Sequence, residues 1–251
     1  MELTPHTTSG GIITQSETGW HMQIPAGLSS NYRLAQLDDY AALHRQKFPW
    51  VTPTILRLRV RVSSNSIPGT WGFGFWNDPF SMFLGLGGMI RSLPVLPNAV
   101  WFFSASQENY LSFRDNKPSN GFLAATFQSP NIPSVYLIPG LLLLPILLIR
   151  PWARWLRTKL GKLIFEDSTR IDIDVTQWNE YRITWEESRV NFEINNHPVF
   201  MTSVSPHVPL GLVIWIDNQF AAFLPDGKLK AGALENQAPA WMEIDGINSQ
   251  S

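Results

Sequence analysis

Short stretches in which apolar and polar residues alternate recur along most of this chain, and they limit most strongly how it can fold. The sequence TILRLRVRV at 54–62 places Leu56, Leu58, Val60 and Val62 on one face, as expected for a strand with one buried side. Further stretches of this kind, separated by Gly, Pro, Asn and Ser, lie at 69–76, 100–106, 122–127, 170–175, 179–185, 189–195, 210–216 and 240–246. The pattern indicates an all-β protein, with helices predicted only at 35–45 and in the segment described next.

An insertion at about 130–168 breaks this pattern. Residues 132–149 are uncharged and mostly apolar, whereas 150–165 are basic and carry two Trp residues. The window from Asn116 to Phe165 contains six Lys or Arg and no Asp or Glu, so with a net charge of −1 for the whole chain the remainder carries −7. An apolar segment beside a basic, Trp-bearing one is typical of segments that lie on anionic bilayers.

We predict that the insertion forms a short apolar hairpin and then an amphipathic basic helix that lies in the membrane interface. Pro139, Gly140 and Pro145 argue against a straight helix that spans the bilayer. Packing of the insertion on its own domain, or oligomerisation through it, remains the alternative. The predicted membrane-binding residues are Leu141, Leu142, Leu143, Leu144, Trp152, Arg154, Trp155, Arg157, Lys159 and Lys162.

Composition excludes several classes of function. The chain of 251 residues is 44% hydrophobic, which predicts a single domain over 1–251. With no Cys there is no disulfide framework and no thiolate site, and the five His residues form no ligand-spaced pair, so we predict no metal and no cofactor. A pI near 6.5 argues against nucleic acid as a partner. Residues 1–6 lack signal-peptide features, so we expect a cytoplasmic protein peripheral to the membrane.

One motif resembles a known fold. The sequence WNEYRITW at 178–185, followed by VNFEINNHPVF at 190–200, resembles a hairpin of concanavalin A-like proteins. The order of strands from about 54 to 247 resembles that of family 16 glycoside hydrolases. The resemblance implies a jelly-roll sandwich of two antiparallel sheets whose concave sheet forms a ligand groove.

The chain departs from the family at the catalytic strand. Family 16 enzymes carry the pattern E-x-D-x-(x)-E there, because a retaining glycosidase needs two carboxyl groups about 5 Å apart. The corresponding stretch at 99–106, AVWFFSAS, contains no carboxylate. The resemblance therefore implies the fold without the family's activity.

Two clusters at strand ends are the remaining candidates for chemistry: Trp76-Asn-Asp78 and Trp215-Ile-Asp-Asn218. Aromatic rings stack on sugars or apolar ligands, and Asp and Asn bond hydroxyls. A buried Asp among aromatic rings has a raised pKa and can donate a proton at neutral pH. Turn or cap roles are the alternative. The predicted ligand-binding residues are Trp71, Trp76, Asn77, Trp101, Trp215 and Asn218, and the candidate acids are Asp78 and Asp217.

Two hypotheses about function follow. The first is a membrane-surface protein that binds a small apolar, lipid-like or glycan ligand in an aromatic concave groove, and is not a conventional glycosidase. The second is an isomerase, cyclase or hydratase that uses a lone Asp as its acid on a hydrophobic substrate taken from the membrane.

Overall fold

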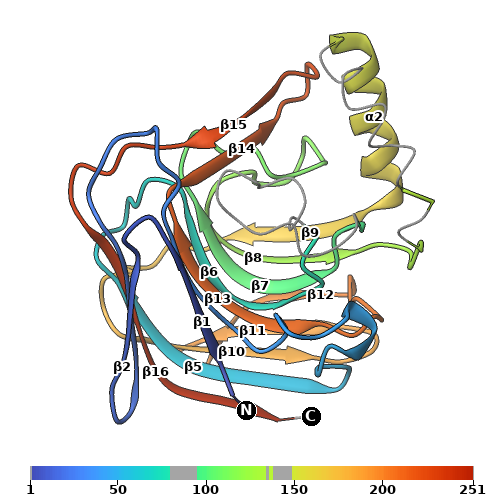
Figure 1. Cartoon of the computed structure of the whole chain (residues 1–251). Coiled ribbons are helices and arrows are strands. Elements are labelled where there is room, and N and C mark those ends of the chain that lie inside the picture. Colours follow the sequence, from blue (N-terminus) through green and yellow to red (C-terminus); the bar gives the residue numbers. More distant parts are fainter. Residues whose placement is uncertain (1, 80–94, 134–135, 138–148, 251) are drawn as a thin grey trace.

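A computed structural model describes residues 2–79, 95–133, 136–137 and 149–250. These residues form two seven-stranded antiparallel sheets packed face to face, with a two-stranded sheet and one longer helix on one side (Figure 1). Sheet A contains, in spatial order, β1 (Thr4–Thr8), β4 (Leu34–Asp38), β13 (Gly211–Asp217), β6 (Thr70–Trp76), β7 (Ala99–Ala105), β8 (Gly121–Gln128) and β9 (Phe165–Arg170).

Sheet B and the smaller elements complete the fold. Sheet B contains β12 (His197–Thr202), β11 (Val190–Ile194), β10 (Asn179–Trp185), β5 (Thr54–Val62), β16 (Ala240–Gln250), β3 (Gly19–Ile24) and β2 (Ile12–Gln15). The small sheet pairs β14 (Gln219–Phe223) with β15 (Leu229–Ala233). Among the described residues, the named helices are a 3-10 turn, η1 (Arg45–Lys47), and α2 (Arg150–Leu163).

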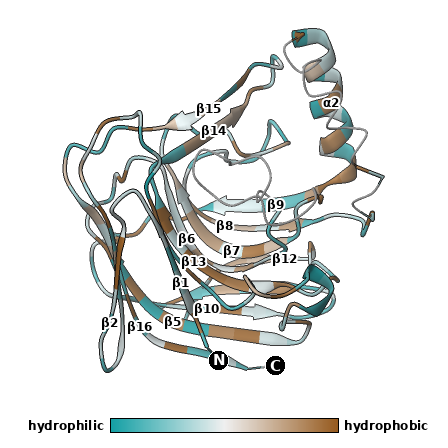
Figure 2. Ribbon diagram, in the orientation of Figure 1, coloured by the Kyte–Doolittle hydropathy of each residue, from teal (hydrophilic) through white to brown (hydrophobic). Residues whose placement is uncertain are grey.

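The main core lies between the two sheets. Alternate residues of β5 are buried there, as the sequence predicts, and large aromatic residues fill the space opposite them. Phe73 packs edge-on against Tyr181, with ring centroids 5.0 Å apart, and Phe75 packs against Trp185 at 5.8 Å. Figure 2 shows hydrophobic residues concentrated on the strands of both sheets. The predicted all-β, two-sheet antiparallel sandwich is confirmed.

The predicted hairpin is also confirmed, because β10 and β11 pair antiparallel with Trp185 opposite Val190. Two other predictions of secondary structure are wrong. The stretch predicted as a helix at 35–45 contains β4, whose Ala35 and Leu37 face the core, and only η1 at its end is helical. The strand predicted at 170–175 lies earlier, because β9 ends at Arg170.

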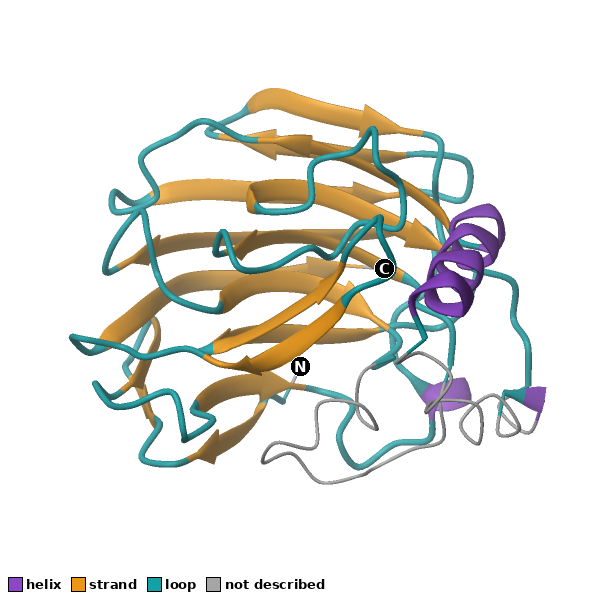
Figure 3. Ribbon diagram, turned by 90° about the horizontal axis from the view of Figure 1, so that it is seen from above, coloured by secondary structure: helices purple, strands orange, loops and turns teal. Residues whose placement is uncertain are grey.

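The insertion contains α2, so its predicted basic helix is present. Ala153 and Arg157 face the rest of the protein and are buried, and Ile164, which follows the helix, is also buried. Figure 3 shows α2 beside the ends of the strands. Among the described residues, no helix has the length and apolar character needed to cross a bilayer. Most of the predicted apolar hairpin, including Leu141, Leu142, Leu143 and Leu144, lies outside the described residues.

Candidate functional site

The face of sheet A that points away from sheet B carries a second aromatic cluster. Figure 1 shows the sheet bending around this concave face, on the side where α2 and β14–β15 lie. Three indole rings meet there, and we call Trp76, Trp101 and Trp215 the tryptophan cluster. The rings of Trp76 and Trp215 are stacked, with centroids 6.1 Å apart and planes 5° apart, and Trp101 lies 5.4 Å from Trp215. The structure thus brings together three residues that the sequence predicts as ligand-binding.

Glycines in β6 create the room that these rings occupy. A Cβ at Gly72 would lie 2.7 Å from Cη2 of Trp215, and a Cβ at Gly74 would lie 2.6 Å from Cβ of Trp101. Both distances are too short for real carbon contacts. Gly72 therefore leaves space for the ring of Trp215, and Gly74 allows the backbone of β7 and the Cβ of Trp101 to approach closely.

The tryptophan cluster is mostly closed to solvent. Trp101 is 6% exposed and Trp215 is 8% exposed, while Trp76 is half-buried and is the most accessible of the three. Tyr40 and Phe48 pack on the cluster together with aliphatic residues of neighbouring strands. Within the described part of the chain, Nε1 of Trp101 has no hydrogen-bond partner. The concave face is therefore a second small core with one accessible indole rather than an open aromatic groove.

A polar network borders the cluster on β1 and β4. Nε1 of Trp76 donates a 2.6 Å hydrogen bond to the Tyr40 hydroxyl, and Nε2 of Gln36 donates a 2.8 Å bond to Oδ2 of Asp38. His6 contacts the same Asp38 oxygen at 3.2 Å. Burial acts to raise the pKa of Asp38, but the bonds from His6 and Gln36 outweigh it and hold that pKa below its usual value. Sequence reasoning missed this network because it predicted a helix here.

Asp217 lies at the end of β13 and is enclosed by protein donors. Its Oδ1 accepts bonds from the Thr70 hydroxyl (2.8 Å), the Thr70 amide (3.2 Å) and the Gln219 amide (3.1 Å), and its Oδ2 accepts one from Tyr32 (3.4 Å). Burial raises the pKa of Asp217 to about 7, although these bonds lower it. Nε1 of Trp215 donates to the same Thr70 hydroxyl, at 2.9 Å, so one chain of hydrogen bonds links the tryptophan cluster to Asp217.

Several predicted site residues have structural roles instead. Trp71 lies in the core between the sheets and stacks on Phe122 with centroids 5.0 Å apart, so it cannot reach the concave face. Asn77 bonds the carbonyl of Leu96 and the amide of Asn98, and therefore fixes a turn.

Asn218 also holds local backbone, and Asp78 lies in a loop whose own backbone is held by Arg45. Asn218 is fully buried, accepts from the amide of Arg33 at 2.7 Å and donates to the carbonyl of Leu234 at 2.7 Å. Asp78 has a positive φ of 50° and is 8% exposed, and Arg45 donates to its carbonyl at 2.6 Å. Asn77, Asp78 and Asn218 thus match the turn and cap alternative.

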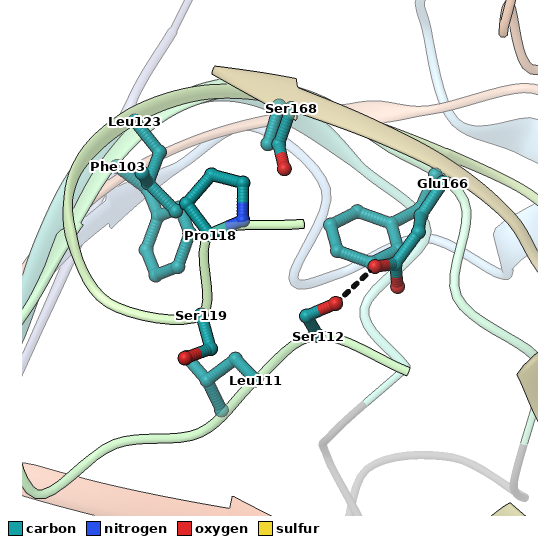
Figure 4. Close-up of a pocket in the computed structure, with 10 residues that line it drawn as sticks. Phe103, Leu111, Ser112, Pro118, Ser119, Leu123, Glu166 and Ser168 are labelled. Carbon is teal, nitrogen blue, oxygen red and sulfur yellow. Dashed lines mark hydrogen bonds between the residues drawn. The ribbon is translucent and has the colours of Figure 1, made fainter. Parts of the chain in front are cut away.

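Strand β7, which contains the stretch that corresponds to the catalytic strand of family 16 enzymes, carries no carboxylate on the concave face. The residues of β7 on that face are Ala99, Trp101, Phe103 and Ala105. Two strands away, Glu166 on β9 lines a small cavity of about 10 Å³, room for about one water molecule (Figure 4). Glu166 accepts bonds from the Ser112 hydroxyl and from the Phe113 amide (2.8 Å), and burial raises its pKa. In the residues that the structure describes, no group of three or more His, Cys, Asp or Glu is placed to hold a metal ion.

The outer face of α2 is the second candidate site. Trp152 and Trp155 are 56% and 54% exposed, with ring centroids 6.2 Å apart, and Nζ of Lys159 lies 5.6 Å from the Trp155 ring. Arg154 and Lys162 are also exposed. The apolar stripe of the helix is divided, because Leu156 and Leu160 are half-buried on the other side.

Arg157 is a correction to the predicted membrane-binding set. It is 5% exposed and points into the protein, where Nη1 pairs with Asp115 at 2.8 Å. Its Nε donates to the carbonyl of Phe223 at 2.9 Å and its Nη2 to that of Ser112 at 3.0 Å. Arg157 therefore holds α2 against the rest of the protein and is not available to a bilayer.

We expect Arg157→Ala to lower the free energy of unfolding by about 2–3 kcal/mol, because two carbonyls lose a charged donor. The matched control is Arg154→Ala, which removes the same side chain from the exposed side of α2 and should change stability by less than about 0.5 kcal/mol. Urea denaturation of the purified proteins measures both. Equal effects of the two substitutions would contradict the anchoring role.

Comparisons with known proteins identify the fold. No protein-family model matches the sequence, and the search of curated proteins returns no match. The structure is similar to a glycoside hydrolase family 16 protein of the Bacteroides ovatus mixed linkage glucan PUL, with a TM-score of 0.53, 9% identity and coverage of 99% of this chain and 94% of that chain. A family 16 endo-glucanase structure from Bacteroides ovatus gives the same values.

A weaker similarity, with a TM-score of 0.49 and 10% identity, is to a legume lectin-like domain from Entamoeba histolytica, covering 99% of this chain and 89% of that domain. The fold assignment rests on the two Bacteroides structures. The chain has the concanavalin A-like lectin and glucanase fold, as the hairpin motif predicts. At 9% identity these similarities establish the fold alone.

Proposed function

We propose that this protein is a peripheral membrane protein, which binds an anionic bilayer through the outer face of α2 and a glycan or lipid-like ligand at the concave face of sheet A. The observation that carries the proposal is the exposure of Trp152 and Trp155 on a helix whose exposed charged residues are all basic. Exposed indole rings among cations suit the depth of lipid headgroups.

The energetics favour a bilayer as the partner. Burial of a large apolar side chain is worth about 1.5–3 kcal/mol. Trp152 and Trp155 would gain part of this free energy by moving from water into a bilayer. Each Lys or Arg near an anionic surface adds on the order of 1 kcal/mol. Because the chain outside residues 116–165 carries a net charge of −7, an anionic surface repels it and attracts α2.

A second copy of the chain is a poorer partner for the same face. A symmetric dimer contact places the same patch of both subunits together. Arg154, Lys159 and Lys162 of one copy would then face the cations of the other, and that contact would cost electrostatic energy. An anionic surface has the complementary charge.

Co-sedimentation with vesicles tests the proposal. Wild-type protein should bind vesicles of phosphatidylcholine and phosphatidylglycerol at low salt, and the double substitution Trp152→Ser/Trp155→Ser should weaken binding at least about tenfold, because the apolar contribution is lost. Arg154→Glu/Lys159→Glu should weaken it by a similar factor, and added salt should weaken binding by the wild type.

The matched control for charge is Arg57→Glu/Arg189→Glu. Both residues are exposed and lie away from α2, Arg57 on β5 and Arg189 in the turn between β10 and β11. The control therefore changes the net charge by the same amount as the α2 variant does. Its binding should stay within about twofold of wild type. If wild type does not bind at low salt, or if the control loses binding as severely as the α2 variants, the proposal is wrong.

On the concave face, Trp76 is the residue best placed to contact a ligand. It is the most accessible member of the tryptophan cluster, and among the described residues the buried Nε1 of Trp101 in the same cluster has no hydrogen-bond partner. β7 brings no carboxylate to this face, so binding is better supported than glycoside hydrolysis.

The enzyme alternative has one supporting observation, the pKa of about 7 at Asp217. An acid of this pKa can donate a proton at neutral pH. However, the protein itself donates all four of these hydrogen bonds to Asp217. Such bonding is typical of a buried structural carboxyl rather than of an acid that contacts a substrate. Binding is therefore the function that the site supports best.

A further inference from the structure

A cavity of about 390 Å³ lies at the C-terminal end of α2, outside the tryptophan cluster. Four of the lining residues lie at the end of β8 or directly after it: Gln128, Ser129, Pro130 and Asn131. The others belong to the last turn of α2, the start of β9 and the loop before β13. The volume lies within the range of small-molecule sites and is many times that of one water molecule.

Of the polar side chains that line this cavity, only Ser129 has a hydrogen-bond partner among the described residues, because its hydroxyl donates to the carbonyl of Pro97 at 2.6 Å. Lys162 and His207 line it, and neither has an ion pair or hydrogen bond with any described residue. The side-chain amides of Gln128 and Asn131 are likewise unbonded within the described ranges. None of the described residues that line the cavity is a carboxylate. Two potential cations and two amides without an acidic neighbour are suited to an anion.

The apolar residues of the cavity indicate that the ligand also has an apolar part. Leu163 and Phe165 line the same cavity and are 38% and 52% exposed, and Val208 lies with them. A small inorganic anion would leave these side chains in water. A ligand with an anionic head and an apolar tail would use both parts of the wall.

The cavity also lies next to the surface that we assign to the bilayer. Lys162 follows Trp155 by seven residues, two helical turns, so both lie on the same side of α2 and are separated by roughly 10 Å along its axis. A lipid in the leaflet contacted by Trp155 would therefore have its headgroup near the cavity.

We propose that this cavity binds the phosphate headgroup of one anionic glycerophospholipid, with the phosphate at Lys162 and His207 and the start of an acyl chain along Leu163 and Phe165. The inference rests on the proposed membrane association for the source of its ligand. The cavity would bind a single lipid molecule, whereas the basic surface of α2 attracts anionic lipids in general, without a defined site.

Short-chain lipids that remain monomeric in solution test the site without a bilayer. Dihexanoyl phosphatidic acid, titrated below its micelle concentration and followed by calorimetry, should bind with one site per chain. Dihexanoyl phosphatidylcholine and inorganic phosphate should bind at least about tenfold more weakly, because the first lacks net charge and the second lacks the apolar part.

Lys162→Gln and His207→Gln should each weaken binding of dihexanoyl phosphatidic acid about tenfold or more. The matched control is Lys230→Gln, which removes an exposed cation from β15 and should leave the affinity unchanged. Thermal melting of each variant shows whether it is folded. All of these lysine and histidine side chains are exposed, so stability should be retained.

Three results would overturn the inference: equal affinity for inorganic phosphate, equal affinity for phosphatidylcholine, or no loss in the Lys162 and His207 variants. Failure of the membrane proposal has a different signature. In that case the wild type would not bind vesicles, while dihexanoyl phosphatidic acid would still bind at one site.

Discussion

Replacement of Trp215 with Ala should lower the free energy of unfolding by about 3–5 kcal/mol, the cost of removing a buried Trp from a packed site. Trp215 is 8% exposed, stacks on Trp76 and packs against Trp101. The substitution also removes the indole donor of Thr70, which in turn donates to Asp217. The loss therefore combines a cavity with a weakened hydrogen-bond chain.

Chemical denaturation measures this effect, and two further substitutions separate its causes. Trp215→Phe keeps an aromatic ring but loses the bond to Thr70, so it should cost clearly less than Trp215→Ala. Trp155→Ala, the same substitution at an exposed ring of α2, should change stability by less than about 0.5 kcal/mol. If Trp215→Ala is no more harmful than Trp155→Ala, the concave-face cluster is not a core.

Ionisation of Asp217 should make stability depend on pH between about 4 and 7. The folded carboxyl has a pKa of about 7, whereas in the unfolded chain the value is about 3.9. Between these values the unfolded chain has lost the proton that the folded protein still holds, so stability falls as pH rises. The raised pKa corresponds to a loss of about 4 kcal/mol once the pH passes the folded value.

Asp217→Asn isolates this contribution from other titrating groups. The Asn Oδ1 accepts the same bonds from Thr70 and Gln219, and its amide donates to the Tyr32 oxygen. The free energy of unfolding of wild type minus that of the variant, measured by denaturation from pH 4 to pH 8, should therefore fall with rising pH. A constant difference across that range would show that Asp217 is ionised throughout.

The residues that the sequence placed correctly are those with a local signal. The alternation in β5 and the turn between β10 and β11 depend on neighbouring residues, so the sequence predicts both. The stretch at 35–45 also has a spacing that fits a helix. Pairing of β4 with β1 and β13, which lie far away in the sequence, decides in favour of a strand.

For the candidate site, too, the sequence predicts some features and misplaces others. Trp76, Trp101 and Trp215 were predicted to bind a ligand, and the structure brings all three together. Trp71 was predicted with them, although it lies five residues before Trp76 on the same strand and must therefore face the opposite side. Its alternation in the sequence was sufficient to exclude it.

Arg157 could not be distinguished from the other cations of α2 by sequence. Every Lys and Arg of the helix fits a basic surface, and the choice of the one that turns inward depends on Asp115 and on the carbonyls of Ser112 and Phe223. These partners come from two other parts of the chain. The same reasoning applies to Glu166, whose donors lie in the loop at 112–114.

The most direct test of membrane binding is the environment of the outer face of α2 on a bilayer. The chain has no Cys, so Thr158→Cys, at an exposed position of this face, carries a spin label at a single site. With vesicles containing phosphatidylglycerol, the label should become more accessible to oxygen and less accessible to a water-soluble nickel complex. A label at Glu187→Cys, in the turn between β10 and β11, should not change. If the label at 158 remains as accessible to the nickel complex with vesicles as without them, α2 does not bind the membrane.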